Sequence, residues 1–153
     1  MSRKKPLVFV EHSRSENQRK KMEEILEKGI CPFCPEFVDS FGPEKCIRKG
    51  QFWSLRENSW PYKGAKLHLL VIHNTHVEII PDLKKEAWLE LLEFVKHAEQ
   101  IYKIKSGSLA IRFGVIGLNG SSVAHLHCHI IVPDTDATER LRFPMGPKQK
   151  KKS

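Results

Sequence analysis

The chain has 153 residues, of which 40% are hydrophobic and 29% are charged, and its formal net charge is +8. This length suits one domain with its own core and is short for two. No apolar run approaches the roughly 18 residues that suggest a membrane span. An apolar signal-peptide core is also missing at the N-terminus, so we expect a cytoplasmic protein without a membrane partner.

Most of the positive charge lies near the two ends of the sequence. Segments 3–5 and 148–152 carry seven of the positive charges, which leaves about +1 for the body between them. Tails of this composition are usually solvated and disordered. We expect a basic N-terminal extension with a helix over residues 1–30 and a disordered basic tail over residues 143–153. Weak attraction of these tails to nucleic acid is left open.

The N-terminal third has one short apolar run and one helical pattern. Residues 7–10 are apolar and can add a strand. Residues 15–28 have the apolar spacing of a helix, with Ser15 and Gln18 as a capping box and Gly29 just past the end.

The rest of the chain reads mainly as strands. Five segments have strand character: residues 45–49, 51–56, 66–72, 109–115 and 124–132. Gly50 fits a tight turn between the first two. Asp82 is expected to cap a long helix whose apolar residues continue at helical spacing to Ile101. The pattern predicts an α+β fold, with a five-stranded, largely antiparallel sheet and one long helix.

Three histidines alternate with apolar residues in the last predicted strand. His125, His127 and His129 are two residues apart, so on a strand they share one face at steps of roughly 6.6 to 6.8 Å. Buried imidazoles need polar partners, and three on one face are hard to explain as structural residues alone. We therefore predict a row that holds phosphate or metal.

A Cys-x-x-Cys motif precedes the first predicted strand. Cys31 and Cys34 have the spacing at which two thiolates bind one tetrahedral zinc ion. No histidine pair follows at the distance of a zinc finger, so any further ligands must be distant in sequence. Cys46 and His73 are rival ligands, and a redox pair or two structural cysteines are the alternatives to a metal site.

The histidine strand and its preceding segment resemble the histidine triad family of nucleotide hydrolases and transferases. The residues that carry the resemblance are Asn119-Gly120-Ser121-Ser122-Val123-Ala124 and then His-φ-His-φ-His-φ-φ. A second match is Asn58-Ser59-Trp60-Pro61-Tyr62, followed by Gly64 and His68. The resemblance covers roughly residues 31–133, and we place a domain of this type at residues 31–142. It implies a five-stranded antiparallel half-barrel that pairs into a homodimer through the long helix and an edge strand.

The resemblance also implies roles for individual residues. His127 is expected to attack the α-phosphate of a nucleotide and form a nucleotidyl-histidine that water cleaves. Partial burial helps by keeping an imidazole neutral. His68 lies behind the nucleophile and orients it, or is a satisfied structural histidine. The implied substrate-binding residues are Asn58, Gly120, Ser121, Ser122 and His129.

Relatives with a Cys-x-x-Cys before the first strand bind zinc with a histidine after the third strand and the first histidine of the triad. This resemblance implies a structural zinc site at Cys31, Cys34, His76 and His125. A zinc-bound His125 cannot also donate a proton to the leaving group.

The expected function is hydrolysis at the α-phosphate of a nucleotide derivative or dinucleoside polyphosphate. His129, in place of the glutamine typical of the dedicated transferases, favours hydrolysis. Asn58 stands where many members have an acidic residue and resembles the dinucleoside-polyphosphate phosphorylase branch, so a phosphorylase or nucleotidyltransferase is an alternative. The other alternative is a zinc-stabilised protein that binds nucleotides or nucleic acid without turnover.

Overall fold

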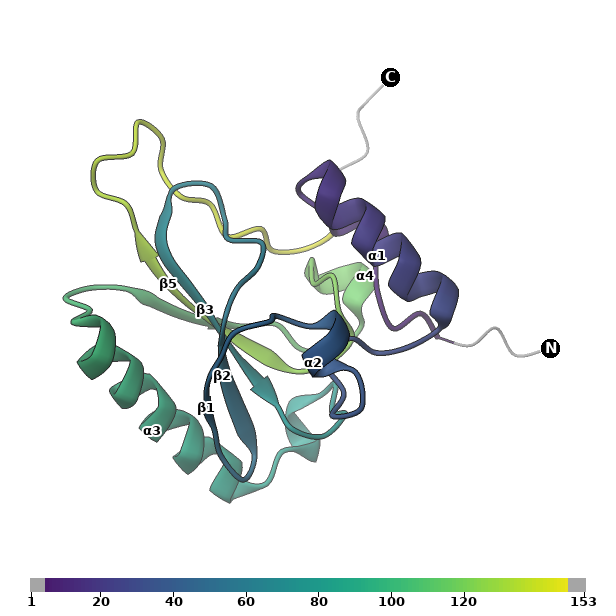
Figure 1. The fold of residues 1–153 in the computed structure, drawn as a ribbon, viewed down its shortest axis with the longest axis horizontal. Helices are drawn as coiled ribbons and strands as arrows, with labels where there is room; N and C mark the ends of the chain where they lie inside the picture. Colours follow the sequence, from purple (N-terminus) through teal and green to yellow (C-terminus); the bar gives the residue numbers. More distant parts are fainter. Residues whose placement is uncertain (1–4, 149–153) are drawn as a thin grey trace.

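An antiparallel sheet of five strands forms the centre of the computed structural model, which describes residues 5–148 (Figure 1). The strands are β1 (Cys46–Lys49), β2 (Trp53–Glu57), β3 (Ala65–His73), β4 (Ser108–Ile111) and β5 (His127–Pro133). They lie in the order β1-β2-β3-β5-β4, and each neighbouring pair is antiparallel. The predicted α+β fold with a five-stranded antiparallel sheet is confirmed.

Within residues 5–148, four α-helices and two short 3₁₀ helices surround the sheet. They are η1 (Val10–His12), α1 (Glu16–Lys28), α2 (Val38–Phe41), η2 (Ile80–Asp82), α3 (Lys85–Tyr102) and α4 (Ile116–Asn119). Helix α3 runs along one side of the sheet, and α1 lies on the other side (Figure 1). No helix of residues 5–148 has the length and apolar character needed to cross a membrane.

The ends of α1 follow the sequence closely. The Ser15 hydroxyl accepts a hydrogen bond from the Gln18 N–H at 3.2 Å, and Gly29 closes the helix in the left-handed region at φ 62°. The Gln18 side chain accepts from the N–H of Arg14 at 2.8 Å, one residue before the position of a complete capping box.

The predicted cap of the long helix was wrong. Helix α3 begins at Lys85, its N-cap is Lys84 without a side-chain hydrogen bond, and Asp82 lies inside η2. Pro81 occupies the first turn of η2, and Leu83 is extended after it, which interrupts the helical backbone between Asp82 and Lys85.

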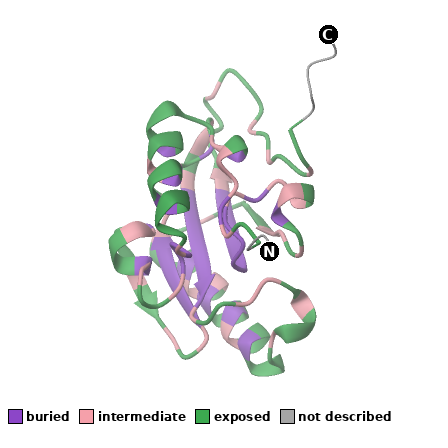
Figure 2. Ribbon diagram, turned by 90° about the vertical axis from the view of Figure 1, so that its right-hand side faces the viewer, coloured by how far each residue is buried: buried purple, intermediate pink, exposed green. Residues whose placement is uncertain are grey.

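The two faces of the sheet have separate cores because strand side chains alternate. The face against α3 is packed by Trp53, Leu55, Leu69, Val71, Ala87, Leu91, Phe94, Ala98, Cys128 and Ile130. The opposite face is packed by Val8, Met22, Ile25, Cys31, Phe33, Val38, Leu70, Ile72 and Val123. Figure 2 shows the buried central strands between these coverings. The alternation turns His127 and His129 away from α3.

Several predicted segments differ from the structure in extent or in kind. The strand expected at residues 124–132 begins at His127, so His125 precedes it, and the strand expected at 109–115 ends at Ile111. Residues 7–10 form a single bridge, Val8 to Val123, instead of a strand. This bridge holds the N-terminal segment beside the residues that lead into β5.

Candidate active site

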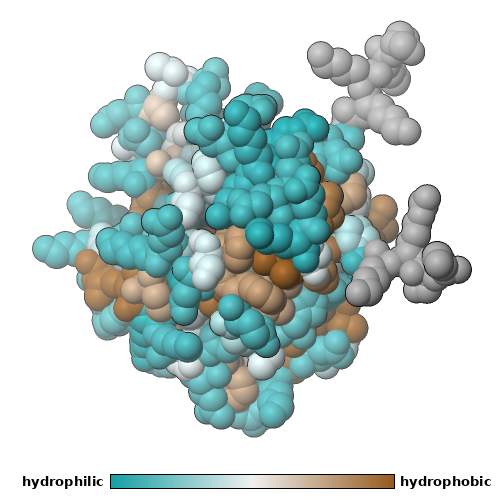
Figure 3. Space-filling view, turned by 45° about the vertical axis from the view of Figure 1, so that its right-hand side comes forward, coloured by the Kyte–Doolittle hydropathy of each residue, from teal (hydrophilic) through white to brown (hydrophobic). Residues whose placement is uncertain are grey.

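A cavity of about 260 Å³ lies on the sheet face opposite α3, between α1 and β5. The surface on this side of the molecule is largely hydrophilic, with hydrophobic side chains gathered in a band across its middle (Figure 3). Five residues predicted to bind substrate or react line the cavity: Asn58, Gly120, Ser122, His127 and His129. Ser121 differs from the prediction, because its hydroxyl is buried and donates to the carbonyl of Val123 at 3.0 Å.

The imidazole of His127 is held by one short hydrogen bond. Its Nδ1 lies 2.6 Å from the carbonyl oxygen of His125, so Nδ1 carries the proton and Nε2 keeps its lone pair. Burial, helped by the charge of Arg112 and opposed by the hydrogen bond to His125, lowers the pKa of His127 to about 4. The ring is therefore neutral at pH 7 and has a free nitrogen in a wall of the cavity.

His68 contacts His129, whereas the prediction placed it behind His127. The backbone N–H of Tyr62 donates to His68 Nδ1 at 3.1 Å, and a backbone amide can only donate. His68 must then carry its proton on Nε2, which lies 2.9 Å from His129 Nδ1. The proton of a neutral His129 is consequently on Nε2, directed to the cavity side. Burial lowers the pKa of His68 to about 3 and that of His129 well below its usual range, so both rings are neutral.

Asn58 supports this pair of histidines. Its side-chain oxygen accepts from the N–H of Trp60 at 2.9 Å, and its amide nitrogen lies beside the His68 ring, 3.3 Å from Nδ1 and 3.1 Å from Nε2. Asn58 thus contacts His68 while it lines the cavity, a role that the family resemblance did not imply.

Arg112 is a site residue that the sequence reasoning missed. Its Nη1 lies 3.3 Å from His129 Nε2, and its Nη2 donates to the Tyr62 hydroxyl at 2.9 Å. The strand pattern could have indicated Arg112. Ala110 pairs with His129 across β4 and β5, and Arg112, two positions after Ala110, is expected on the same face of the sheet.

Two residues after position 142 hold Arg112 in place. Its Nε donates to the carbonyl of Pro144 at 3.1 Å, and its guanidinium lies 3.9 Å from the centre of the Phe143 ring. The Phe143 ring is also 5.2 Å from His129. The sequence placed a disordered tail from residue 143, but Phe143 and Pro144 form part of the cavity's surroundings. We propose that the dispensable tail begins after Pro147.

The N-terminal extension also reaches the cavity. Arg14, Gln18, Lys21, Met22 and Ile25 all line it. Arg14 precedes α1, and the other four follow helical spacing, so one face of α1 is turned to the site. The family resemblance begins at about residue 31, after this helix, and could not reveal its place at the cavity.

The loop before β5 is tied down by the same extension. His12 Nδ1 lies 2.6 Å from the carbonyl of Ser121, and the Phe9 N–H donates to the carbonyl of Ser122 at 2.8 Å. Inside the loop, the Ser121 N–H donates to the Asn119 side chain at 2.8 Å. The amide of Ser121 is thus occupied and does not face a ligand.

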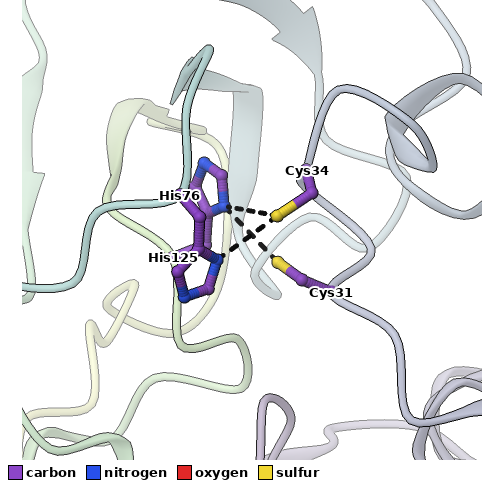
Figure 4. A group of neighbouring side chains, drawn as sticks. All are labelled: Cys31, Cys34, His76 and His125. Atoms are coloured by element: carbon purple, nitrogen blue, oxygen red, sulfur yellow. Dashed lines mark hydrogen bonds between the residues drawn. The ribbon is translucent and has the colours of Figure 1, made fainter.

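Cys31, Cys34, His76 and His125 form a second cluster at the start of β5 (Figure 4). Their sulfur and nitrogen atoms turn toward one another and all lie within 4.8 Å. Cys31 Sγ is 3.4 Å and Cys34 Sγ is 3.8 Å from His125 Nδ1. Cys34 Sγ is 3.3 Å from His76 Nδ1. Two sulfurs and two imidazole nitrogens make a donor set suited to tetrahedral zinc.

The outer contacts of the two histidines fit a metal site. His125 Nε2 donates to the carbonyl of His73 at 2.7 Å, which leaves the lone pair of Nδ1 facing the sulfurs. His76 Nε2 lies 3.1 Å from Glu78 Oε1 in the same manner. The rival ligands lie elsewhere: Cys46 is exposed on β1, and the ring of His73 contacts the carbonyl of Thr75.

The antiparallel sheet and the three histidines at positions 125, 127 and 129 agree with a match to a known family. The family model described as HIT domain matches residues 62–136, and the chain therefore contains a domain of the histidine triad family. No curated protein sequence matches the chain.

Solved structures share the fold. A Hit-like protein is 22% identical with a TM-score of 0.56, covering 69% of this chain and 100% of that one. A HIT family hydrolase from Clostridium thermocellum is 20% identical with a TM-score of 0.51, covering 72% and 95%. A Zn-bound histidine triad family protein from Mycobacterium smegmatis is 22% identical with a TM-score of 0.53, covering 74% and 83%.

Proposed function

We propose that the chain hydrolyses a nucleotide derivative or dinucleoside polyphosphate at its α-phosphate through a nucleotidyl-histidine. The observation that carries this proposal is the orientation of His127. The carbonyl of His125 holds the proton on Nδ1, so the lone pair on Nε2 is free beside the cavity. A neutral, oriented imidazole is a good nucleophile toward phosphorus.

The reaction takes two steps. His127 Nε2 forms a bond to the α-phosphorus while the bond from phosphorus to the leaving group breaks, and the leaving group takes a proton from water. A second water then attacks phosphorus, the P–N bond breaks, and the water proton goes to solvent, which restores neutral His127. The Nε2–H of His129 and the guanidinium of Arg112 can hold phosphate oxygens as negative charge develops.

His125 is a poor candidate for the leaving-group acid. Its Nδ1 faces the two cysteines and its Nε2 donates to the carbonyl of His73. Neither nitrogen has a proton to give to the leaving group, which supports water in that role.

His127→Ala tests the proposal, with His97→Ala on α3 as a matched control on the opposite side of the sheet. A panel of mononucleotide derivatives and dinucleoside polyphosphates is supplied with and without inorganic phosphate, and the nucleotidyl adduct is sought by intact mass after acid-free quenching. We expect an adduct and turnover in wild type and His97→Ala and neither in His127→Ala. Full turnover by folded His127→Ala would refute the role.

The same experiment separates the alternatives. A nucleoside diphosphate formed only when phosphate is present would identify a phosphorylase. Nucleotide binding with no adduct in the wild-type protein would identify a binding protein without turnover.

We also propose zinc as the ligand of the Cys31, Cys34, His76 and His125 cluster. The donor set, the outer hydrogen bonds to His73 and Glu78, and the likeness to a Zn-bound structure support it. Zinc there would join the cysteine loop to the start of β5 and to the loop after β3, which is a structural role.

We further propose a homodimer that pairs through α3 and the edge strand β4. Leu89 and Leu92 on α3 are 58% and 56% exposed, and Leu109 on β4 is 53% exposed. Large apolar side chains grouped on one surface favour association. Light scattering is expected to give twice the chain mass. Leu92→Glu should halve it, whereas Leu118→Glu on α4 should leave it unchanged, and a monomeric wild type would contradict the proposal.

A further inference from the structure

The charged side chains around the cavity are mostly cationic. Among residues 5–148, Arg14, Lys21 and Arg112 line it, with Glu44 as the one carboxylate. None of the three cations forms a salt bridge within the described residues. The cavity thus has a surplus of two positive charges, and a site of this kind favours an anionic ligand.

Two of these cations come from the N-terminal extension, and aromatic rings support both. The Arg14 guanidinium lies 4.2 Å from the centre of the Tyr62 ring. Lys21 Nζ lies 4.9 Å from the centre of the Phe41 ring. Arg14 precedes the N-cap Ser15, and Lys21 lies on α1, so the two charges reach the same cavity from separate parts of the extension.

Arg112, the third cation, lies beside His129, and both groups are hydrogen-bond donors at this contact. The hydrogen bond from the Tyr62 N–H to His68 and the next one to His129 place a proton on His129 Nε2. Arg112 Nη1, which can only donate, is 3.3 Å away. Two neighbouring donors are satisfied together by one anionic oxygen, and charge-assisted hydrogen bonds of this kind are the strong ones.

We propose that Arg14, Lys21 and Arg112 form a subsite for a condensed phosphate chain, which selects nucleotides whose leaving group carries at least one further phosphate. The inference rests on the proposed function for the place of the α-phosphate beside His127. A bridging α-phosphate carries about one negative charge and offsets half of the surplus. The remaining charge calls for more phosphate on the leaving side, among the cations that line the same cavity.

Binding of inorganic tripolyphosphate tests the subsite without any chemistry. Calorimetry compares the wild-type chain with Arg14→Ala and Lys21→Ala, and Arg19→Ala and Lys20→Ala serve as controls. Arg19 and Lys20 are exposed on α1, the helix that carries Lys21, and do not line the cavity. We expect tripolyphosphate to bind more tightly than inorganic phosphate.

The variants should separate clearly. Arg14→Ala is expected to weaken tripolyphosphate binding about tenfold or more, in line with hydrogen bonds to charged groups. Lys21→Ala should weaken it at least about threefold, and the controls should change it less than twofold. Equal weakening in the controls, or wild-type tripolyphosphate binding no tighter than phosphate binding, would overturn the subsite.

A second arm distinguishes a small nucleotide from a nucleic-acid end. If Arg14→Ala and Lys21→Ala weaken binding of a 5′-phosphorylated oligonucleotide but leave tripolyphosphate binding unchanged, the proposal falls.

Turnover separates the subsite from the proposed function. Arg14→Ala should lower kcat/KM for a dinucleoside polyphosphate much more than for a nucleoside phosphoramidate, whose leaving amine has no phosphate. A nucleotidyl-histidine with unaltered selectivity would remove the subsite and keep the proposed function. The expected tripolyphosphate pattern with no turnover of any nucleotide would keep the subsite and remove the proposed function.

Discussion

Cutting the chain after Arg142 should damage the candidate active site even though the sheet ends earlier, at Pro133. The cut removes the Phe143 ring beneath the Arg112 guanidinium and the Pro144 carbonyl that accepts from it. Arg112 would keep its hydrogen bond to the Tyr62 hydroxyl and its contact with His129. It would lose its contacts with Phe143 and Pro144.

The size of the effect follows from the contacts that are lost. A cation–π contact at a partly exposed site contributes about 0.5–1 kcal/mol. Hydrogen bonds from a charged donor contribute roughly 1.5–3 kcal/mol, and the exposure of Pro144 reduces this to about 1 kcal/mol. A total of about 1.5–2 kcal/mol corresponds to a loss of roughly 10- to 30-fold in kcat/KM.

Steady-state kinetics with a small nucleotide substrate measure this loss, with truncation after Pro147 as the control. The longer variant keeps Phe143 and Pro144 and should retain wild-type kcat/KM, while its binding to nucleic acid at low salt weakens because lysines are lost. Equal activity of the two truncated proteins, with thermal unfolding unchanged, would refute the positioning of Arg112 by this segment.

Two further predictions concern the metal cluster and acid stability. Chelation or Cys34→Ser should lower Tm by roughly 10 °C, because 1 kcal/mol shifts Tm by about 2–4 °C at this size and a lost ligand costs several kcal/mol. Cys46→Ser should leave Tm unchanged. A protein that elemental analysis shows to be free of metal and that keeps full thermal stability would contradict the site. Because burial lowers the pKa of His68 to about 3, the unfolded chain, with a histidine pKa of about 6.5, binds more protons between these values. The free energy of unfolding should therefore fall as pH drops below about 6.5, by up to about 1.4 kcal/mol per pH unit for this histidine. Urea unfolding at pH 7, 6 and 5 measures this free energy. A wild-type free energy of unfolding that does not change with pH would contradict the burial of His68.

The strand pattern alone was enough to predict the sheet and the side of it that carries the site. Alternation in β5 places His127 and His129 on one face, and the structure has them there. The same reasoning applied to β4 would have found Arg112 beside His129. Asp82 shows the limit of local rules, because it is a good capping residue that lies one 3₁₀ turn too early.

The sequence could not show contacts that depend on tertiary folding. His76 joined the predicted metal cluster through the family resemblance, since no spacing rule links it to Cys31. Arg14 and Phe143 lie outside that resemblance and are more than 120 positions apart in the sequence. Periodicity describes neighbours along one element and is silent on which distant segments fold over a cavity.

Arg14 and Arg112 line the same cavity, and Arg112 is held by Phe143 and Pro144, which lie more than 120 positions after Arg14. Lys148 donates to the carbonyl of Ser13 across 135 positions. Contacts of such long separation bring the largest loop-closure cost, so they form late during folding and open early when the chain fluctuates. During synthesis α1 leaves the ribosome well before Phe143 is added, and the cavity stays incomplete until both have emerged. A ligand that contacts both segments would then stabilise the closed state, because its binding energy adds to that state alone.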